Sequence, residues 1–156
     1  MKPFEYIVEI HGPAVFRFLA GRVGPDRAED CFQETMLAAL RGYDEVREPK
    51  AVRSWLFTIA TRKSIDAYRQ SGRLPLADRP ADDLPDRSGL GRPGDKDIWS
   101  VVAQLPGKQA LAVELRYRAG LSHREVGEVM EVSESAARRN VFEGLKRLRE
   151  GSGSWT

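Results

Sequence analysis

LSHREVGEVMEVSESAARR, residues 121–139, is the stretch that decides the fold of the C-terminal part of this chain. Ser122 followed three residues later by Glu125 is typical of a capping box at the start of a helix. Ser133 is the expected N-cap of a second helix, which we expect to continue to Arg149. The stretch therefore predicts a short helix, a tight connection and a longer helix.

The longer helix separates its side chains into an apolar side and a basic stripe, given about 100° of rotation per residue. The apolar side consists of Ala137, Val141, Gly144, Leu145 and Leu148. The stripe consists of Ser135, Arg138, Arg139, Phe142, Lys146 and Arg149. Such a pair of helices is typical of a helix-turn-helix, whose second helix enters the major groove of DNA. A helical hairpin with a solvated charged face fits equally well, because the quoted stretch also contains four glutamates.

Composition excludes several classes of protein. The 156 residues are 41% apolar and 31% charged, which favours a globular chain, and the formal net charge is only +2. One cysteine excludes an internal disulfide framework and a cysteine-rich zinc site, and two distant histidines give a metal site little support, so we expect no metal and no cofactor. We expect no enzyme, because the sequence has no nucleophile–base arrangement and no phosphate-binding glycine loop.

The expected compartment is the cytoplasm. The N-terminal residues lack the cleavage site of a secretory signal. No apolar run approaches the roughly 20 residues of a membrane span, so we expect no insertion into a membrane.

The chain divides into blocks of different composition. Residues 1–71 and 97–150 are rich in helix formers, whereas residues 72–96 contain four prolines and four glycines. We expect a flexible linker at 72–96 and a disordered tail at 151–156. No stretch alternates apolar and polar residues with a period of two. The predicted fold is therefore all-α, with two small helical domains joined by the linker, the C-terminal one a helix-turn-helix.

Three helices are predicted in the first block. The first covers Glu5–Leu19, and the second runs from an N-cap at Asp26 to about Arg41, with Gly42 as its stop. Ser54 is the expected N-cap of the third helix, which ends near Ser71.

The third predicted helix combines aromatic and basic residues on one face, namely Trp55, Ile59, Arg62, Asp66 and Arg69. That combination suits stacking on unpaired bases together with neutralisation of phosphates. A lone tryptophan is more often a core anchor than a base-stacking residue, so Trp55 alone does not decide between these roles.

Two groups of motifs resemble bacterial sigma factors of the extracytoplasmic-function (ECF) group. The motif AED-x-x-QET-x-L at residues 28–37, followed by SWLFTIA-x-x-x-x-ID-x-x-R at 54–69, resembles their second domain. Residues 105–139 resemble their fourth domain, which ends in a helix-turn-helix. Both groups occur in the family's order on either side of a linker, which is far more specific than either group alone. The resemblance implies a promoter-specificity subunit of RNA polymerase and not an enzyme.

The resemblance also implies roles for individual residues and partners. The residues implied to dock on the clamp coiled coil of the polymerase's largest subunit are Asp30, Gln33, Glu34 and Leu37, which share one helical face. Those implied to contact the minus-ten promoter element are Tyr43, Arg47, Lys50, Arg53, Trp55, Arg62, Lys63 and Arg69. Those implied to contact the minus-thirty-five element are Arg124, Ser135, Arg138, Arg139 and Lys146. The implied partners are core RNA polymerase, through its clamp coiled coil and its flap, promoter DNA and an anti-sigma factor.

The turn of the helix-turn-helix departs from the family's usual pattern. Met130-Glu131 stands where glycine is usual, and Gly127 stands where alanine is usual. If the turn needs a positive φ, Met130 or Glu131 must adopt it at an energetic cost. Two other functions stay open from the residues: a helix-turn-helix regulator that binds duplex DNA without polymerase, and a sigma-like protein that acts only through protein contacts.

Overall fold

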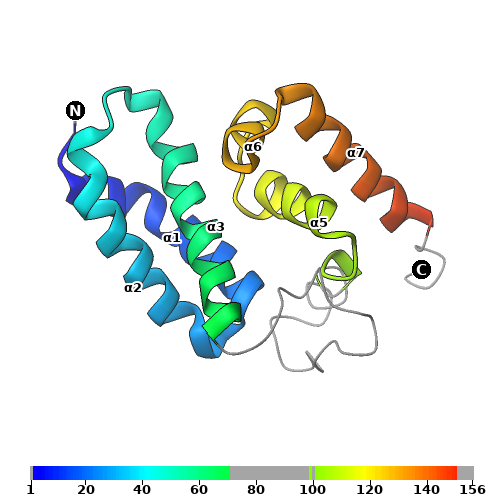
Figure 1. Ribbon diagram of the computed structural model, residues 1–156, viewed down its shortest axis with the longest axis horizontal. Helices are drawn as coiled ribbons and strands as arrows, with labels where there is room; N and C mark the ends of the chain where they lie inside the picture. The colour runs from blue at the N-terminus through cyan, green and yellow to red at the C-terminus, as the bar shows by residue number, and fades with distance from the viewer. Residues whose placement is uncertain (1, 71–98, 100, 151–156) are drawn as a thin grey trace.

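The structure, a computed structural model, describes residues 2–70, 99 and 101–150, and its regular elements are all helical (Figure 1). The first domain consists of α1 (Phe4–Val23), α2 (Pro25–Gly42), the 3₁₀ turns η1 (Tyr43–Glu45) and η2 (Pro49–Ala51), and α3 (Val52–Gln70). The second domain consists of α5 (Gly107–Val113), the π-helical turn η5 (Glu114–Arg118), α6 (His123–Met130) and α7 (Glu134–Glu150). The all-helical prediction is confirmed for these residues, while the predicted linker and tail lie outside them.

Two predicted helix starts are wrong. The residue before α2 is Gly24 with φ 87°, and Pro25 opens the helix, so Asp26 lies in the first turn and does not cap it. Proline suits this first position, because it has no N–H to leave unsatisfied and its φ is already helical. Ser54 lies inside α3, because the helix continues directly from η2, whose N-cap is Glu48. The Ser54 side chain is also buried.

The predicted start signals of α6 and α7 are confirmed. Ser122 Oγ accepts from the Glu125 N–H, and the Glu125 carboxylate accepts from the Ser122 N–H at 3.0 Å, which completes the capping box. Ser133 Oγ accepts from the Ala136 N–H at 3.0 Å. The α7 helix continues through Gly144, where an added Cβ would lie 2.8 Å from a methyl of Val113. Glycine at this position therefore lets α7 approach α5 closely.

The core of the first domain is centred on aromatic rings of α1 and α3. Phe18 and Phe57, both 0% exposed, pack edge to face with ring centroids 5.5 Å apart. Near the end of α1, Arg22 Nε donates to Ser64 Oγ at 2.8 Å, and the Tyr68 hydroxyl donates to the Arg22 carbonyl. These contacts fix α1 against α3.

The two domains pack against each other. A continuous cluster of buried apolar residues joins Leu56 of α3 to Val126 of α6. Figure 1 shows α6 facing α3, with α7 on the side of the molecule away from the first domain. A second contact joins Arg22 Nη1 to Glu114 Oε2 of η5 at 3.8 Å, with both side chains at most 8% exposed. The sequence predicted a tether between the domains but not this interface.

Candidate nucleic-acid and polymerase interfaces

The basic stripe of α7 is an exposed face, as the periodicity predicted. Ser135, Arg138, Arg139 and Lys146 are exposed, whereas Ala137 is buried against the rest of the domain. The stripe residue Arg138 reaches Glu134 one turn earlier at 2.9 Å and remains 59% exposed. On α6, the Arg124 side chain is 77% exposed and lies 3.3 Å from Glu128. The five basic or polar side chains assigned to the minus-thirty-five element, the upstream element of the promoter, are thus accessible on one domain.

The turn between α6 and α7 adopts the conformation that the sequence made costly. Glu131 has φ 59° and ψ 42°, and its N–H donates to the Gly127 carbonyl. The Val132 N–H donates to the same carbonyl at 2.9 Å, which closes the helix end in the manner of a Schellman motif. A Cβ on Gly127 would lie 2.8 Å from the Val132 carbonyl oxygen. The two departures from the family's pattern, Glu131 in the turn and Gly127 in the helix, belong together. The left-handed turn at Glu131 folds back over Gly127, a position that only glycine can occupy.

Glu131→Gly is expected to stabilise the second domain by about 1 kcal/mol, because glycine adopts the left-handed conformation without the steric cost of a Cβ. Loss of the exposed ion pair between Glu131 and Arg62 subtracts little from this gain. Urea unfolding followed by circular dichroism measures the change. Glu128→Gly inside α6 is the control and should destabilise the domain by about 1 kcal/mol. A loss of stability in Glu131→Gly would contradict this account of the turn.

The aromatic residues assigned to the minus-ten element lie at the edge of the core. Tyr43 is 8% exposed, packs edge to face with Phe4 and donates its hydroxyl to the Lys2 carbonyl. The rings of Tyr43 and Trp55 lie 6.4 Å apart, and Trp55 is half-buried against the core cluster. The structure therefore brings these two rings together and gives both a packing role. Their contacts with bases stay predictions.

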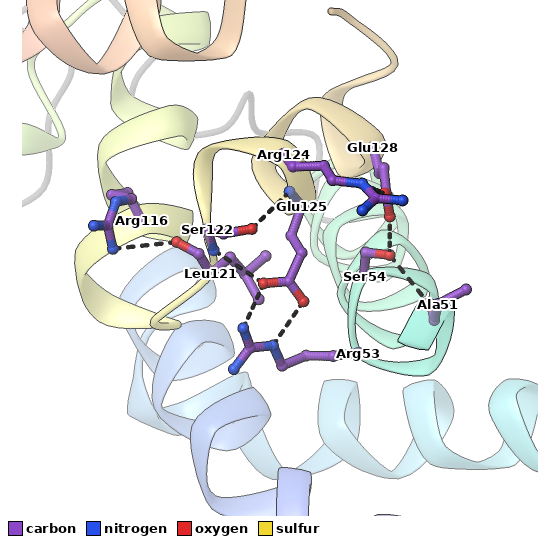
Figure 2. Close-up of polar contacts among 9 residues, drawn as sticks. All are labelled: Ala51, Arg53, Ser54, Arg116, Leu121, Ser122, Arg124, Glu125 and Glu128. Atoms are coloured by element: carbon purple, nitrogen blue, oxygen red, sulfur yellow. Dashed lines mark hydrogen bonds and ion pairs between the residues drawn. The ribbon is translucent and has the colours of Figure 1, made fainter. Parts of the chain in front are cut away.

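The basic residues of the same set differ in their surroundings. Arg47 and Lys50 are exposed in the segment before α3, and Arg69 is exposed at its end, while Lys63 is half-buried. The Arg53 side chain, 39% exposed, reaches the second domain. Its Nε donates to Glu125 Oε2 at 2.8 Å and its Nη2 donates to the other carboxylate oxygen (Figure 2). This two-point contact lowers the pKa of Glu125 to about 2 and raises that of Arg53.

Two further contacts continue this line along α3. The Ser54 hydroxyl donates to a carboxylate oxygen of Glu128, and Arg62 Nη2 lies 3.3 Å from Glu131 Oε1. The three acids that face α3 are Glu125, Glu128 and Glu131, spaced i, i+3 and i+6. Sequence reasoning assigned Glu125 only a capping role, considered Glu131 only as a turn residue and gave Glu128 no role. The spacing was the signal that could have shown one acidic face.

The residues assigned to polymerase binding lie together on the outer face of α2. Asp30, Gln33 and Glu34 are exposed, and Leu37 is 52% exposed despite being apolar. The opposite side of α2 is buried, as Ala39 at 0% exposure shows. The outer face thus combines two carboxylates, an amide and an exposed leucine in consecutive turns, which is a surface suited to a helical partner of basic character.

Comparison with known proteins gives the same picture for most of the chain. The family described as Sigma-70 region 2 matches residues 7–74, and Sigma-70, region 4 matches residues 95–148. The chain is 31% identical to RNA polymerase sigma factor CarQ of Myxococcus xanthus, over 94% of this chain and 87% of that protein. It is 33% identical to ECF RNA polymerase sigma factor SigF of Caulobacter vibrioides, over 81% of this chain and 71% of that protein.

A solved structure has a similar fold. The sigma factor RpoE of Bartonella quintana, crystallised with the anti-sigma factor NepR, superposes with a TM-score of 0.75 at 22% identity, covering 96% of both chains.

Proposed function

This chain belongs to the sigma-70 family, in its ECF group, and we propose that its two domains divide promoter recognition as the assigned residues indicate. Sigma factors bind core RNA polymerase, direct it to promoters and are not enzymes. In the proposal, the first domain binds polymerase through α2 and the minus-ten element through α3, and the second domain binds the minus-thirty-five element through α7. The observation that supports this best is the exposed arginine face at the start of α7.

In the second domain, the first turns of α7 would lie in the major groove. Arg138 and Arg139 present forked donors that suit guanine O6 and N7 or a phosphate, and the Ser135 hydroxyl can donate or accept. Arg124 on α6 and Lys146 further along α7 are exposed cations, which suit phosphates. The phosphate contacts would position the helix, and the contacts to base edges would supply specificity.

In the first domain, α3 and the segment before it would hold the separated non-template strand. Unstacking a base costs a few kcal/mol, which stacking and phosphate contacts must offset. Trp55 and Tyr43 supply adjacent aromatic rings at the edge of the core. Arg47, Lys50 and Arg69 supply exposed positive charge around them. In this proposal, promoter opening therefore requires the chain to bind the separated strand and involves no covalent reaction.

The remaining partner and the compartment are also part of the proposal. Because the similar RpoE of Bartonella quintana is bound by an anti-sigma factor, we infer that an anti-sigma factor binds this chain as well. Among the described residues, none of the helices has the length and apolar character that crossing a bilayer requires. The proposed compartment is the cytoplasm, where a polymerase subunit acts.

Arg138→Ala with Arg139→Ala is expected to abolish dependence on the upstream element while leaving polymerase binding unchanged. Each lost bidentate contact costs about 1–3 kcal/mol of discrimination, and both arginines are exposed on α7. Transcription from promoters with and without the upstream element measures the effect, and co-purification with core polymerase is the control. Equal loss of polymerase binding and of dependence on the upstream element would refute the assignment of these two functions to different domains.

A further inference from the structure

The glutamates of residues 121–139 have a role that DNA binding by α7 does not explain. Three of the four face α3 and contact side chains there, whereas Glu134 lies on α7 beside Arg138. The exposed fraction of their side chains rises along the line, from 15% at Glu125 through 41% at Glu128 to 74% at Glu131. The contact is therefore tightest at the start of α6 and looser at the turn.

These carboxylates contact α3 side chains of the kind that bind phosphates. Arg53 holds both oxygens of Glu125 with two N–H groups, which is the fork geometry by which arginine also binds phosphate (Figure 2). Arg62 meets the Glu131 carboxylate, and the Ser54 hydroxyl donates to that of Glu128. Two of the three α3 residues in these contacts are ones assigned to minus-ten DNA. A DNA strand and the Glu125 carboxylate cannot both bind Arg53 in this way at the same time.

A buried ion pair fixes the domains in this arrangement. The π-helical turn η5 directs Glu114 at the end of α1, where it meets Arg22 with both side chains at most 8% exposed. Arg22 also donates to Ser64 of α3. Separation of the domains would return both charges to water, so the pair defines one relative placement of the domains more than it stabilises the fold.

We propose that Glu125, Glu128 and Glu131, together called the acidic line, form an internal mimic of a nucleic-acid strand. This acidic line covers α3 and keeps the free chain closed. This inference rests on the proposed function, because it takes α3 to be the DNA-binding helix of the first domain. Single-stranded DNA and the acidic line then compete for Arg53 and Arg62, and the chain must open to bind a separated strand. The stripe of α7 stays exposed in the closed form, so only strand binding is masked.

The test compares two triple variants that remove the same number of negative charges. Glu125→Gln, Glu128→Gln and Glu131→Gln together remove the mimic, and glutamine at 125 retains the capping box. Glu5→Gln, Glu9→Gln and Glu29→Gln, on exposed positions of α1 and α2, form the matched control. Fluorescence anisotropy with a labelled oligothymidine strand measures binding by the full chain without polymerase.

The mimic triple variant is expected to bind the strand about 10-fold more tightly than the wild type, because closure no longer reduces the binding-competent fraction. The control should change much less, as its charges lie away from α3. Equal gains in both triple variants would show a general charge effect and overturn the proposal. No gain in the mimic variant would overturn it as well.

Closure is measured separately by energy transfer between dyes on Asp26→Cys and Glu143→Cys, one on each domain. The native Cys31 should stay unlabelled, because it is 2% exposed and burial raises the pKa of its thiol to about 11. Glu114→Gln, which leaves the acidic line intact, is expected to lower energy transfer and to increase strand binding, whereas Glu150→Gln should do neither. Unchanged energy transfer in Glu114→Gln would overturn the closed arrangement. Lower transfer without a gain in strand binding would overturn the masking.

The proposed function is tested independently of closure. If the wild type bound core polymerase but supported no promoter-specific transcript, the role assigned to α3 would fail while the energy-transfer result still reported on closure.

Discussion

Asp30→Lys with Glu34→Lys should weaken binding to core RNA polymerase by about 100-fold, the largest effect on function that we expect from a change at the surface. Both carboxylates are exposed on the outer face of α2, beside Leu37 at 52% exposure. Reversal replaces attraction to a basic partner by repulsion and leaves the buried side of α2 unchanged. The double variant should therefore keep its helical content and its melting temperature.

Binding is measured by titrating labelled chain with core polymerase at fixed ionic strength, since contacts between exposed charges are screened by salt. Glu5→Lys with Glu9→Lys makes the same charge change on exposed positions of α1 and is the matched control. A similar loss in the control would indicate that total charge, not the α2 face, governs binding. Unchanged affinity in the α2 variant would remove this face from the polymerase interface.

Phe57→Ala is expected to have the largest effect on stability, a loss of about 3–5 kcal/mol. Phe57 is 0% exposed on α3 and packs edge to face on Phe18 of α1, so truncation leaves a cavity between two helices that cannot readily close. Domains of this size are stable by only about 5–15 kcal/mol in total. The variant should therefore unfold at a much lower urea concentration, or fail to fold.

The control for this cavity is Phe16→Ala. Phe16 also packs edge to face, against Phe32, but it is 40% exposed, so solvent can fill the space that its ring leaves. Its loss should be less than half that of Phe57→Ala by the same urea titration. Equal losses for the two variants would contradict the placement of the core between α1 and α3.

Local signals in the sequence were sufficient for α6 and α7 of the second domain, whereas α5 and η5 were not predicted. The capping box at Ser122, the cap at Ser133 and the exposed stripe of α7 all depend on residues within a few positions of one another, and all three are confirmed. The start of α2 was predicted less well, because Pro25 and a positive φ at Gly24 took the place of the polar cap expected at Asp26. Two plausible start signals stood side by side, and the backbone preference of proline decided between them.

The interface between the domains could not be predicted in the same way. Arg22 and Glu114 belong to different domains, and nothing near either residue in the sequence indicates that they meet in a buried pair. Ser54 resembled an N-cap because it precedes an apolar run, yet it is buried against α6 and its hydroxyl donates to Glu128. Such residues obtain their roles from tertiary contacts, which periodicity and capping rules do not contain. The roles assigned to Tyr43 and Trp55 from family resemblance are contacts with DNA bases, and they remain predictions.

Promoter-specific run-off transcription by reconstituted holoenzyme tests the central claim most directly. Purified chain is added to core polymerase with a pool of promoter fragments, and bound fragments are selected and transcribed. We expect transcripts of defined length from a subset of fragments that share an upstream and a downstream element, and none from core polymerase alone. Failure of the chain to bind core polymerase at all would contradict its function as a sigma factor.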